Sequence, residues 1–201
     1  MDNKDKSTES SFVQFWRVAA SGLVDPSDNV PPTWSFGDTS EMANRLLALV
    51  LSGKKTATTG LYQEYIDGGE SLPIVGELSI ILDGDGLPRA LVREAEVVVT
   101  RFGDITPAQA AAEGEGDQTL ESWRANHRAF FEGRGHTINN DSLVVWERFE
   151  VLYMRLQSLD RPAGPDIDSL LEAIWADQTP DEKQAVRDRM AELYDEKGLP
   201  A

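Results

Sequence analysis

Residues 76–102 read GELSIILDGDGLPRALVREAEVVVTRF, a stretch dominated by strand-forming residues. Two β runs, 76–82 and 88–102, flank the turn Asp-Gly-Asp-Gly at 83–86. Asp-Gly between two such runs is a strong hairpin signal, because both residue types tolerate the backbone angles of a tight turn. A third β run covers residues 142–153. These runs predict a small, mainly antiparallel β structure, which we expect to close into a barrel.

Helical patterns lie on both sides of these strands. The clearest covers residues 38–52, where Asp38, Thr39 or Ser40 can cap a helix that carries an apolar stripe, and Gly53 marks its end. Another begins at Thr106-Pro107 and runs through 112, with proline in the first turn. Shorter or weaker signals predict helices over 11–21 and 120–132, an irregular segment over 62–69, and a frayed polar start over 1–11.

The C-terminal part differs in kind from the rest. After Arg-Pro-Ala-Gly-Pro at 161–165, two helical patterns cover 166–177 and 179–197. We expect a helical hairpin there, packed on the domain or on a second subunit. The predicted fold is therefore α+β. Its parts are a polar N-terminal segment with a short helix over 1–33, a main domain over 34–157, and an acidic helical extension over 158–201.

Composition limits the classes of function. The 201 residues are 40% hydrophobic and 27% charged, with neither a long apolar run nor a signal-peptide pattern. No cysteine is present, which removes disulfides and thiolate chemistry and favours the cytoplasm. The net charge is −16, and the last 44 residues carry 11 acidic and 5 basic groups. Such a surface repels a long polyanion, so extended duplex nucleic acid is not an expected partner.

The order of these elements resembles the ASCH domain family, a branch of the PUA-like superfamily. The resemblance covers roughly residues 34–153 and is most similar to the larger bacterial members. It rests on five segments in order: LVLSGKKTAT at 49–58, FGDIT at 102–106, AEGEGD at 112–117, Trp123-Arg124-x-x-His127-x-x-Phe130-Phe131, and VVWERF at 144–149. For the fold, the resemblance implies a small PUA-like barrel flanked by helices.

For function, the resemblance implies RNA or a nucleoside-type small molecule as the partner. Compact members of the family hydrolyse the amide of N4-acylated cytidines with a lysine, a threonine and a glutamate, and another member is a ribonuclease. Residue by residue, that catalytic set falls on Lys55, Thr58 and Glu113. Additional ligand-binding candidates beside it are Lys54, Thr56, Glu115, Arg124 and His127.

Each candidate residue also has an ordinary structural explanation. Lys54 and Lys55 suit a helix C-terminus, where positive charge is favourable, and the threonines suit a strand leaving the turn. Trp123 is more typical of a core position than of a base-stacking platform. His127 and His136 are the only histidines, and without a paired histidine or a cysteine they predict no metal site. No dinucleotide or phosphate-loop motif indicates a cofactor.

Three functions therefore remain open from the sequence. The first is an enzyme acting on RNA or a modified nucleoside, and the second is a non-catalytic RNA-binding module that uses the same cleft. The third is an interaction protein that works through its acidic tail. The enzyme reading predicts that the Lys55 ammonium lies within about 6 Å of the Thr58 hydroxyl or the Glu113 carboxylate. It also predicts that replacing Lys55 by alanine abolishes turnover while barely changing the melting curve.

Overall fold

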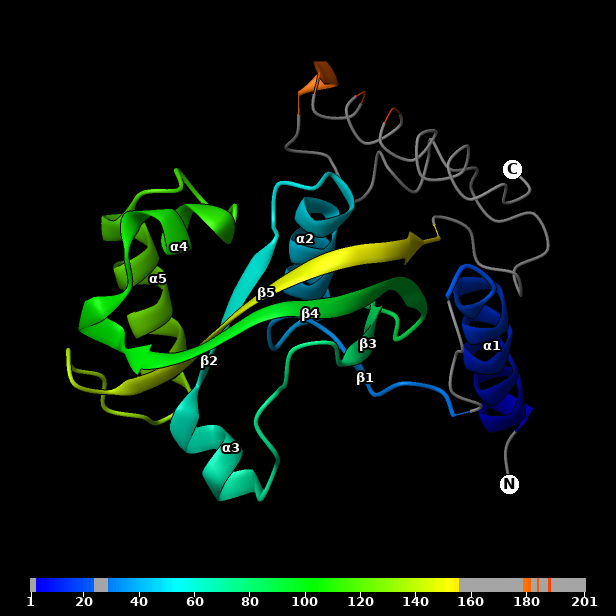
Figure 1. The fold of residues 1–201 in the computed structure, drawn as a ribbon, viewed down its shortest axis with the longest axis horizontal. Helices are drawn as coiled ribbons and strands as arrows, with labels where there is room; N and C mark the ends of the chain where they lie inside the picture. Colours follow the sequence, from blue (N-terminus) through cyan, green and yellow to red (C-terminus); the bar gives the residue numbers. More distant parts are fainter. Residues whose placement is uncertain (1–2, 24–28, 156–178, 182–183, 185–187, 189–201) are drawn as a thin grey trace. The chain divides into compact units, whose positions relative to one another are not determined.

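The computed structural model describes residues 3–23, 29–155, 179–181, 184 and 188 of the chain. Its elements are drawn in Figure 1. In chain order they are α1 (Asn3–Ala20), β1 (Thr33–Trp34), α2 (Ser40–Leu51), β2 (Ala57–Leu61), α3 (Tyr62–Gly68), β3 (Leu78–Leu82), β4 (Pro88–Arg101), the 3-10 turn η1 (Phe102–Asp104), α4 (Pro107–Ala112), α5 (Leu120–Gly133) and β5 (Leu143–Met154).

The strands form one mixed sheet in the order β1-β3-β4-β5-β2. β1 pairs parallel to β3, and β2 pairs antiparallel to β5 with Thr58 opposite Glu147 and Thr59 opposite Trp146. Within the part of the chain that the structure describes, no pairing joins the edge strands β1 and β2. The expectation of a mixed α+β fold is confirmed, whereas the expected closed barrel is not seen, because the sheet remains open at both edges.

Contacts within the chain divide it into two compact units. The first contains Met1–Gly53, Leu78–Val92 and Val151–Ala201, and the second contains Lys54–Glu77 and Arg93–Glu150. Both β4 and β5 contribute residues to each unit. The boundary between the units therefore crosses β4 and β5 and does not fall at a linker between two consecutive domains.

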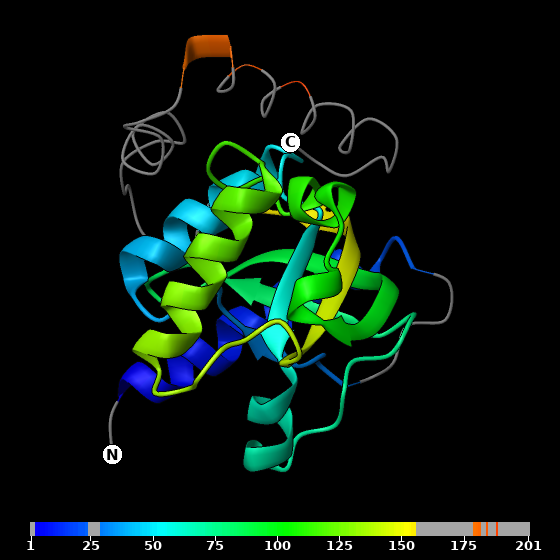
Figure 2. The same cartoon turned by 90° about the vertical axis from the view of Figure 1, so that its left-hand side faces the viewer.

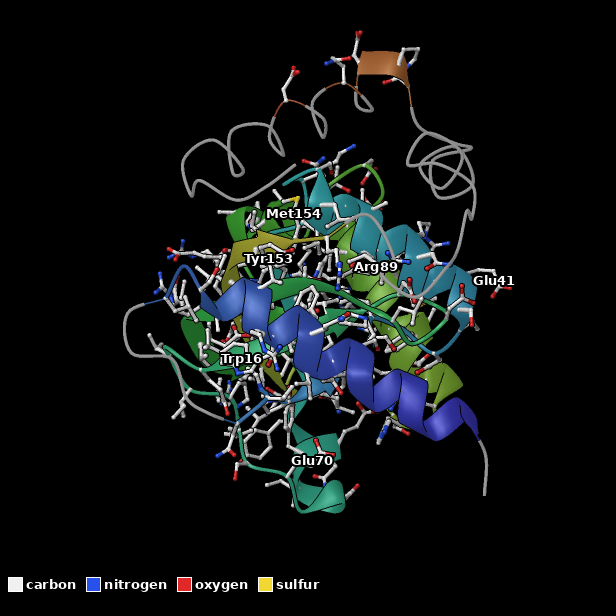
Figure 3. The ribbon with its side chains drawn as sticks, turned by 90° about the vertical axis from the view of Figure 1, so that its right-hand side faces the viewer. Trp16, Glu41, Glu70, Arg89, Tyr153 and Met154 are labelled. Carbon is white, nitrogen blue, oxygen red and sulfur yellow. The ribbon has the colours of Figure 1, made fainter. Side chains whose placement is uncertain are left out.

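The first unit has its own apolar core. The ring of Phe15 on α1 meets that of Tyr153 on β5 edge to face, with 5.3 Å between ring centroids. Trp16 and Tyr153, both labelled in Figure 3, belong to this core. Its buried members are Phe15, Trp16, Ala19, Ala20, Ile80, Leu91 and Tyr153.

The second unit is built around α4, α5, β2 and the first half of β5. Helices α4 and α5 lie alongside each other in both Figure 1 and Figure 2. The side chains between these elements are apolar, and they fix the end of α4 against β2. The buried members are Ala57, Leu61, Phe102, Ile105, Ala110, Trp123, Phe131, Ile138, Val144 and Trp146.

Several predicted elements are confirmed with their physical causes. Thr39 caps α2 by accepting a hydrogen bond from the Met42 amide, and Gly53 follows the helix with φ of 71°. Thr106 and Gln109 form a reciprocal capping box at the start of α4, with Pro107 in the first turn. These are short-range effects, which is why the sequence alone was sufficient to predict them.

Two segments differ from the prediction. The expected frayed start is helical from Asn3 onward, so α1 is longer than the 11–21 pattern indicated. The segment 62–69, expected to be irregular, contains α3, a seven-residue helix that ends at Gly69 with φ of 65°. Helix α3 buries none of its residues, so its sequence lacks the apolar stripe by which an amphipathic helix is predicted.

The predictions for the C-terminal part concern residues that the structure largely does not describe. The predicted hairpin over 166–197 and the predicted boundary at residue 158 lie outside the described residues, apart from 179–181, 184 and 188. Among the helices that are described, none has both the length and the apolar character needed to cross a bilayer.

Candidate functional site

Lys55 is the centre of a buried charge cluster in the second unit. Its ammonium nitrogen lies 2.6 Å from Glu115 Oε1 and 3.5 Å from Glu113 Oε2. The side chains of Lys55 and Glu113 are each only 1% exposed, whereas Glu115 is 28% exposed. Glu115 is therefore the member of the cluster that solvent or a ligand can reach.

Two backbone turns bring these residues together. The amide and the hydroxyl of Thr56 both donate to the carbonyl of Ala112, at 2.8 and 3.1 Å, which ties the turn before β2 to the end of α4. Gly114 has φ of 68°, and a Cβ at that position would lie 2.2 Å from the Lys54 carbonyl oxygen. Only glycine permits this approach, which explains the glycine between the two glutamates.

Glu113 receives further hydrogen bonds from the core side of the unit. Its Oε1 accepts from the Thr59 hydroxyl and from the Trp123 indole N–H, both at 2.6 Å. Its Oε2 lies 3.2 Å from His127 Nε2. Burial alone raises the pKa of this carboxyl, but the Lys55 ammonium, His127 and the hydrogen bond from Thr59 outweigh burial and lower the pKa to about 2.

Helix α5 presents the two aromatic partners of Glu113. Trp123 and His127 are four residues apart and therefore lie on one face of the helix. Their rings stack with 4.3 Å between centroids and 23° between planes. His127 Nδ1 lies 3.0 Å from the Trp123 carbonyl oxygen, so both imidazole nitrogens face acceptor oxygens.

The structure brings Lys55 and Glu113 together, within the expected 6 Å, but not Thr58. The burial of β2 alternates, with Ala57, Thr59 and Leu61 buried and Thr58 half-buried. Successive side chains of a strand point to opposite faces, so Thr58 shares its face with Glu147 while Thr59 faces Glu113. Thr59 is thus the threonine of this cluster, a position that the family spacing did not indicate.

The other predicted ligand residues fall into two groups. His127 and Glu115 contact the cluster directly. Lys54 is exposed, Thr56 holds the turn, and the Arg124 guanidinium donates to the Gly103 carbonyl at 2.8 Å on another side of α5. Within the described residues, no group of histidine and carboxylate side chains is arranged to hold a metal ion.

Sequence reasoning also missed a second polar cluster, on the face of β2 that carries Thr58. Tyr65 donates a hydrogen bond to Glu147 Oε1 at 3.0 Å, and Glu94 is buried nearby. Burial, together with neighbouring carboxylates, raises the pKa of Glu94 to about 8; burial also raises that of Glu147 to about 7. The sequence feature that could have indicated this cluster is Glu147, an acidic residue inside the apolar run of β5.

The Lys55 cluster combines a fixed cation with a reachable carboxylate. The ammonium can stabilise negative charge that develops on an oxygen, and the Glu115 carboxylate can accept a proton from water or a hydroxyl. Glu113, held ionised beneath them, positions the ammonium. This arrangement suits acyl or phosphoryl chemistry as well as simple recognition of a polar ligand.

These features define a class of protein: a small α+β domain in which a Gly-Lys turn meets an acidic, glycine-rich helix end. The chain belongs to the ASCH domain family, whose model matches residues 32–153. A solved structure of a protein from Enterococcus faecalis V583 is 35% identical, with a TM-score of 0.61 over 73% of this chain and 88% of that one. An ASCH domain from Lactobacillus crispatus JV V101 is 27% identical, with a TM-score of 0.60 over 76% and 96%. No curated protein matches the chain.

Proposed function

We propose that this ASCH protein acts on RNA or a modified nucleoside through the cluster of Lys55, Glu113 and Glu115. The observation that carries the proposal is the contact of 2.6 Å between a fully buried ammonium and a partly exposed carboxylate. A lysine is rarely buried unless it is paired, and the lowered pKa of Glu113, the other partner of Lys55, is a feature that gathers at functional sites. The family's general link to RNA binding and hydrolysis supports the same substrate class.

For an N4-acylated cytidine, the proposed reaction is hydrolysis of the amide. Glu115 accepts a proton from water while the water oxygen forms a bond to the acyl carbon. The carbonyl oxygen takes up the negative charge beside the Lys55 ammonium. The bond from carbon to N4 then breaks and N4 takes the proton back from Glu115, which gives cytidine and a carboxylic acid that releases its proton to solvent. Glu113 acts as a positioning residue, because it is 1% exposed and its Oε1 is held by hydrogen bonds from Thr59 and Trp123.

The same groups suit RNA cleavage. Glu115 would accept the proton of a ribose 2′-hydroxyl as its oxygen forms a bond to the adjacent phosphorus, and the ammonium would stabilise the charge on the phosphate. The bond from phosphorus to the 5′-oxygen of the next nucleotide would break, and that oxygen would take the proton back from Glu115, which leaves a 2′,3′-cyclic phosphate. Because the protein carries a net charge of −16, the proposal favours nucleosides or short single strands over long polyanions.

The test is incubation of the purified protein with a panel of N4-acylated cytidines and short single-stranded RNAs. We expect Glu115→Gln to lower kcat/KM about 100-fold or more, in the range of general-base catalysis. Its melting temperature should stay close to that of the parent, because Glu115 is partly exposed and Lys55 keeps its ion pair with Glu113. Glu121→Gln is the matched control, an exposed glutamate in the first turn of α5. Equal activity of the two variants on a turned-over substrate would exclude Glu115 as the base.

The burial of Lys55 favours one second candidate, a non-catalytic binding module. An ammonium that is 1% exposed and ion-paired to two carboxylates is well placed to shape a cleft without entering a reaction. On this reading, fluorescence-labelled short RNAs or nucleosides bind saturably, no substrate of the panel is turned over, and Glu115→Gln changes the Kd alone.

A further inference from the structure

The second polar cluster, formed by Tyr65, Glu94 and Glu147, lies within the second unit and shares no residue with the Lys55 cluster. Glu94 is 4% exposed and Glu147 is 7% exposed. The Tyr65 hydroxyl donates to Glu147 Oε1 at 3.0 Å, and Gly60 lets it approach, since a Cβ there would lie 2.9 Å from that hydroxyl. The cluster is thus built by three elements: α3, β4 and β5.

One carboxylate oxygen of this cluster lacks a hydrogen-bond partner. Glu94 Oε2 is buried, and no donor of the described residues reaches it. A buried polar atom without a partner is rare in native proteins and needs an explanation. When Glu94 is ionised its carboxylate oxygens can only accept, so a ligand that binds this form must donate a hydrogen bond to Oε2.

The charges around the cluster have a single sign. Among the described residues, those that act on Glu94 are the carboxylates of Glu77 and Glu147, and those that act on Glu147 are Glu77 and Glu113. Tyr65 experiences Glu70, Glu94 and Glu147. The charged side chains that shift the pKa values of Tyr65, Glu94 and Glu147 are thus all carboxylates. The missing hydrogen-bond donor would therefore be most favourable if it were a cation.

A graded series of acids connects the cluster to solvent. Glu70 and Glu77 are exposed, and Glu70, which follows α3, is labelled in Figure 3. Tyr65 is half-buried, and Glu147 and Glu94 are buried. Helix α3 buries none of its residues, and it contacts the cluster through Tyr65. The exposed acids Glu70 and Glu77 attract a small cation toward the buried pair.

We propose that Glu94 and Glu147, with Tyr65, form a binding site for the ammonium group of a small primary amine. An ammonium has three donors, enough to satisfy Glu94 Oε2 and a Glu147 oxygen together. A multidentate metal is the poorer fit, because within the described residues no group of three or more carboxylate or histidine side chains can hold one. This site uses none of the residues of the proposed reaction, so the failure of either proposal leaves the other intact.

Amine binding at this site is coupled to release of a proton. The pKa of Glu94 is raised to about 8 in the free protein, so an amine that needs the ionised carboxylate must displace the proton near neutral pH. The ionised fraction of such a group rises from about 1% at pH 6 to about 90% at pH 9. The affinity for an amine that stays protonated throughout this range should therefore increase with pH, by at least about tenfold from pH 6 to pH 9.

The test is isothermal titration calorimetry with putrescine at constant ionic strength, repeated at pH 6, 7 and 9. The neutral analogue 1,4-butanediol has the same chain length without the ammonium groups. We expect saturable binding of putrescine, at least about tenfold tighter at pH 9 than at pH 6, and none of the diol. Nα-acetyl-lysinamide separates the two sources of a primary ammonium: tighter binding of putrescine supports a free amine, and preference for the lysine derivative overturns that assignment.

Glu94→Gln should abolish putrescine binding, because the neutral amide also donates hydrogens toward the ammonium. Glu96→Gln is the matched control on the same strand, an exposed carboxylate paired with Arg148 at 3.2 Å, and should bind as the parent does. Equal binding by the parent and both variants would reveal attraction to the acidic surface alone and overturn the proposal. If Glu94→Gln does not fold, the parent protein provides the test: titrations at pH 7 in two buffers of different ionisation enthalpy should show net release of protons on amine binding. Release of none overturns it.

Discussion

Replacing Lys55 by methionine tests the charge cluster most directly. The substitution keeps a flexible side chain of similar length but removes the ammonium. Lys55 and Glu113 are each 1% exposed and 3.5 Å apart, so the change leaves a carboxylate buried without its cation. Breaking a buried pair on one side costs about 3–5 kcal/mol. Glu113 keeps the donors Thr59 and Trp123, so we expect a loss near the lower end, about 3 kcal/mol.

The reverse variant is predicted to cost less. In Glu113→Gln, Lys55 keeps its contact of 2.6 Å with Glu115, so the buried ammonium still has a carboxylate partner. The double variant Lys55→Met with Glu113→Gln removes both charges, and it should be less destabilised than the sum of the two single variants. Directly contacting pairs of this kind show interaction energies of about 0.5–3 kcal/mol.

The assay is urea unfolding at pH 7, followed by circular dichroism, with the m-value compared among variants. Lys54→Met is the matched control, because it removes a lysine from the neighbouring, exposed position and should stay within about 0.5 kcal/mol of the parent. A Lys55→Met protein as stable as Lys54→Met would refute the buried ion pair. The burial of Lys55 leads us to expect a lower melting temperature, in place of the sequence-based expectation that its loss leaves the melting curve nearly intact.

Three further variants probe the same unit. Because the pKa of Glu94 is raised, the folded protein holds a proton between about pH 4.5 and 8 that the unfolded chain has released, so stability falls as pH rises through this range. In thermal melts from pH 5 to 9, Glu94→Gln should reduce this decline in stability, and an unchanged slope would contradict the assignment. Thr59→Val removes a donor at 2.6 Å from Glu113 and should cost about 1.5–3 kcal/mol in urea unfolding, a prediction that fails if the loss is below about 0.5 kcal/mol. Gly114→Ala forces a Cβ to 2.2 Å from the Lys54 carbonyl oxygen at φ of 68°, so we expect at least about 2 kcal/mol of destabilisation; a melting temperature equal to the parent's would show that the turn moves freely.

The elements of the central domain could be predicted from the sequence because their causes are local. The cap at Thr39, the capping box at Thr106 and the Asp-Gly turn of the hairpin each depend on residues within four positions of one another. Helix α3 could not be predicted, because its causes are not local. It has no buried stripe, and the Tyr65 hydroxyl donates a hydrogen bond to Glu147, 82 positions away. A contact at such a separation leaves no periodic mark in the sequence.

The sequence by itself also determined the family, through motifs in a fixed order, and with it the expectation that Lys55 and Glu113 meet. Which threonine joins them was decided only by the tertiary structure. The choice between Thr58 and Thr59 depends on which face of β2 turns toward α4 and α5, and a shift of one residue in a strand moves every side chain to the other face. That face is set by the packing of Ala57 and Leu61 against the distant Trp123 and Phe131. The open sheet and the carboxylates of Glu94 and Glu147 likewise depend on strand pairing and burial, which arise only when remote segments fold together.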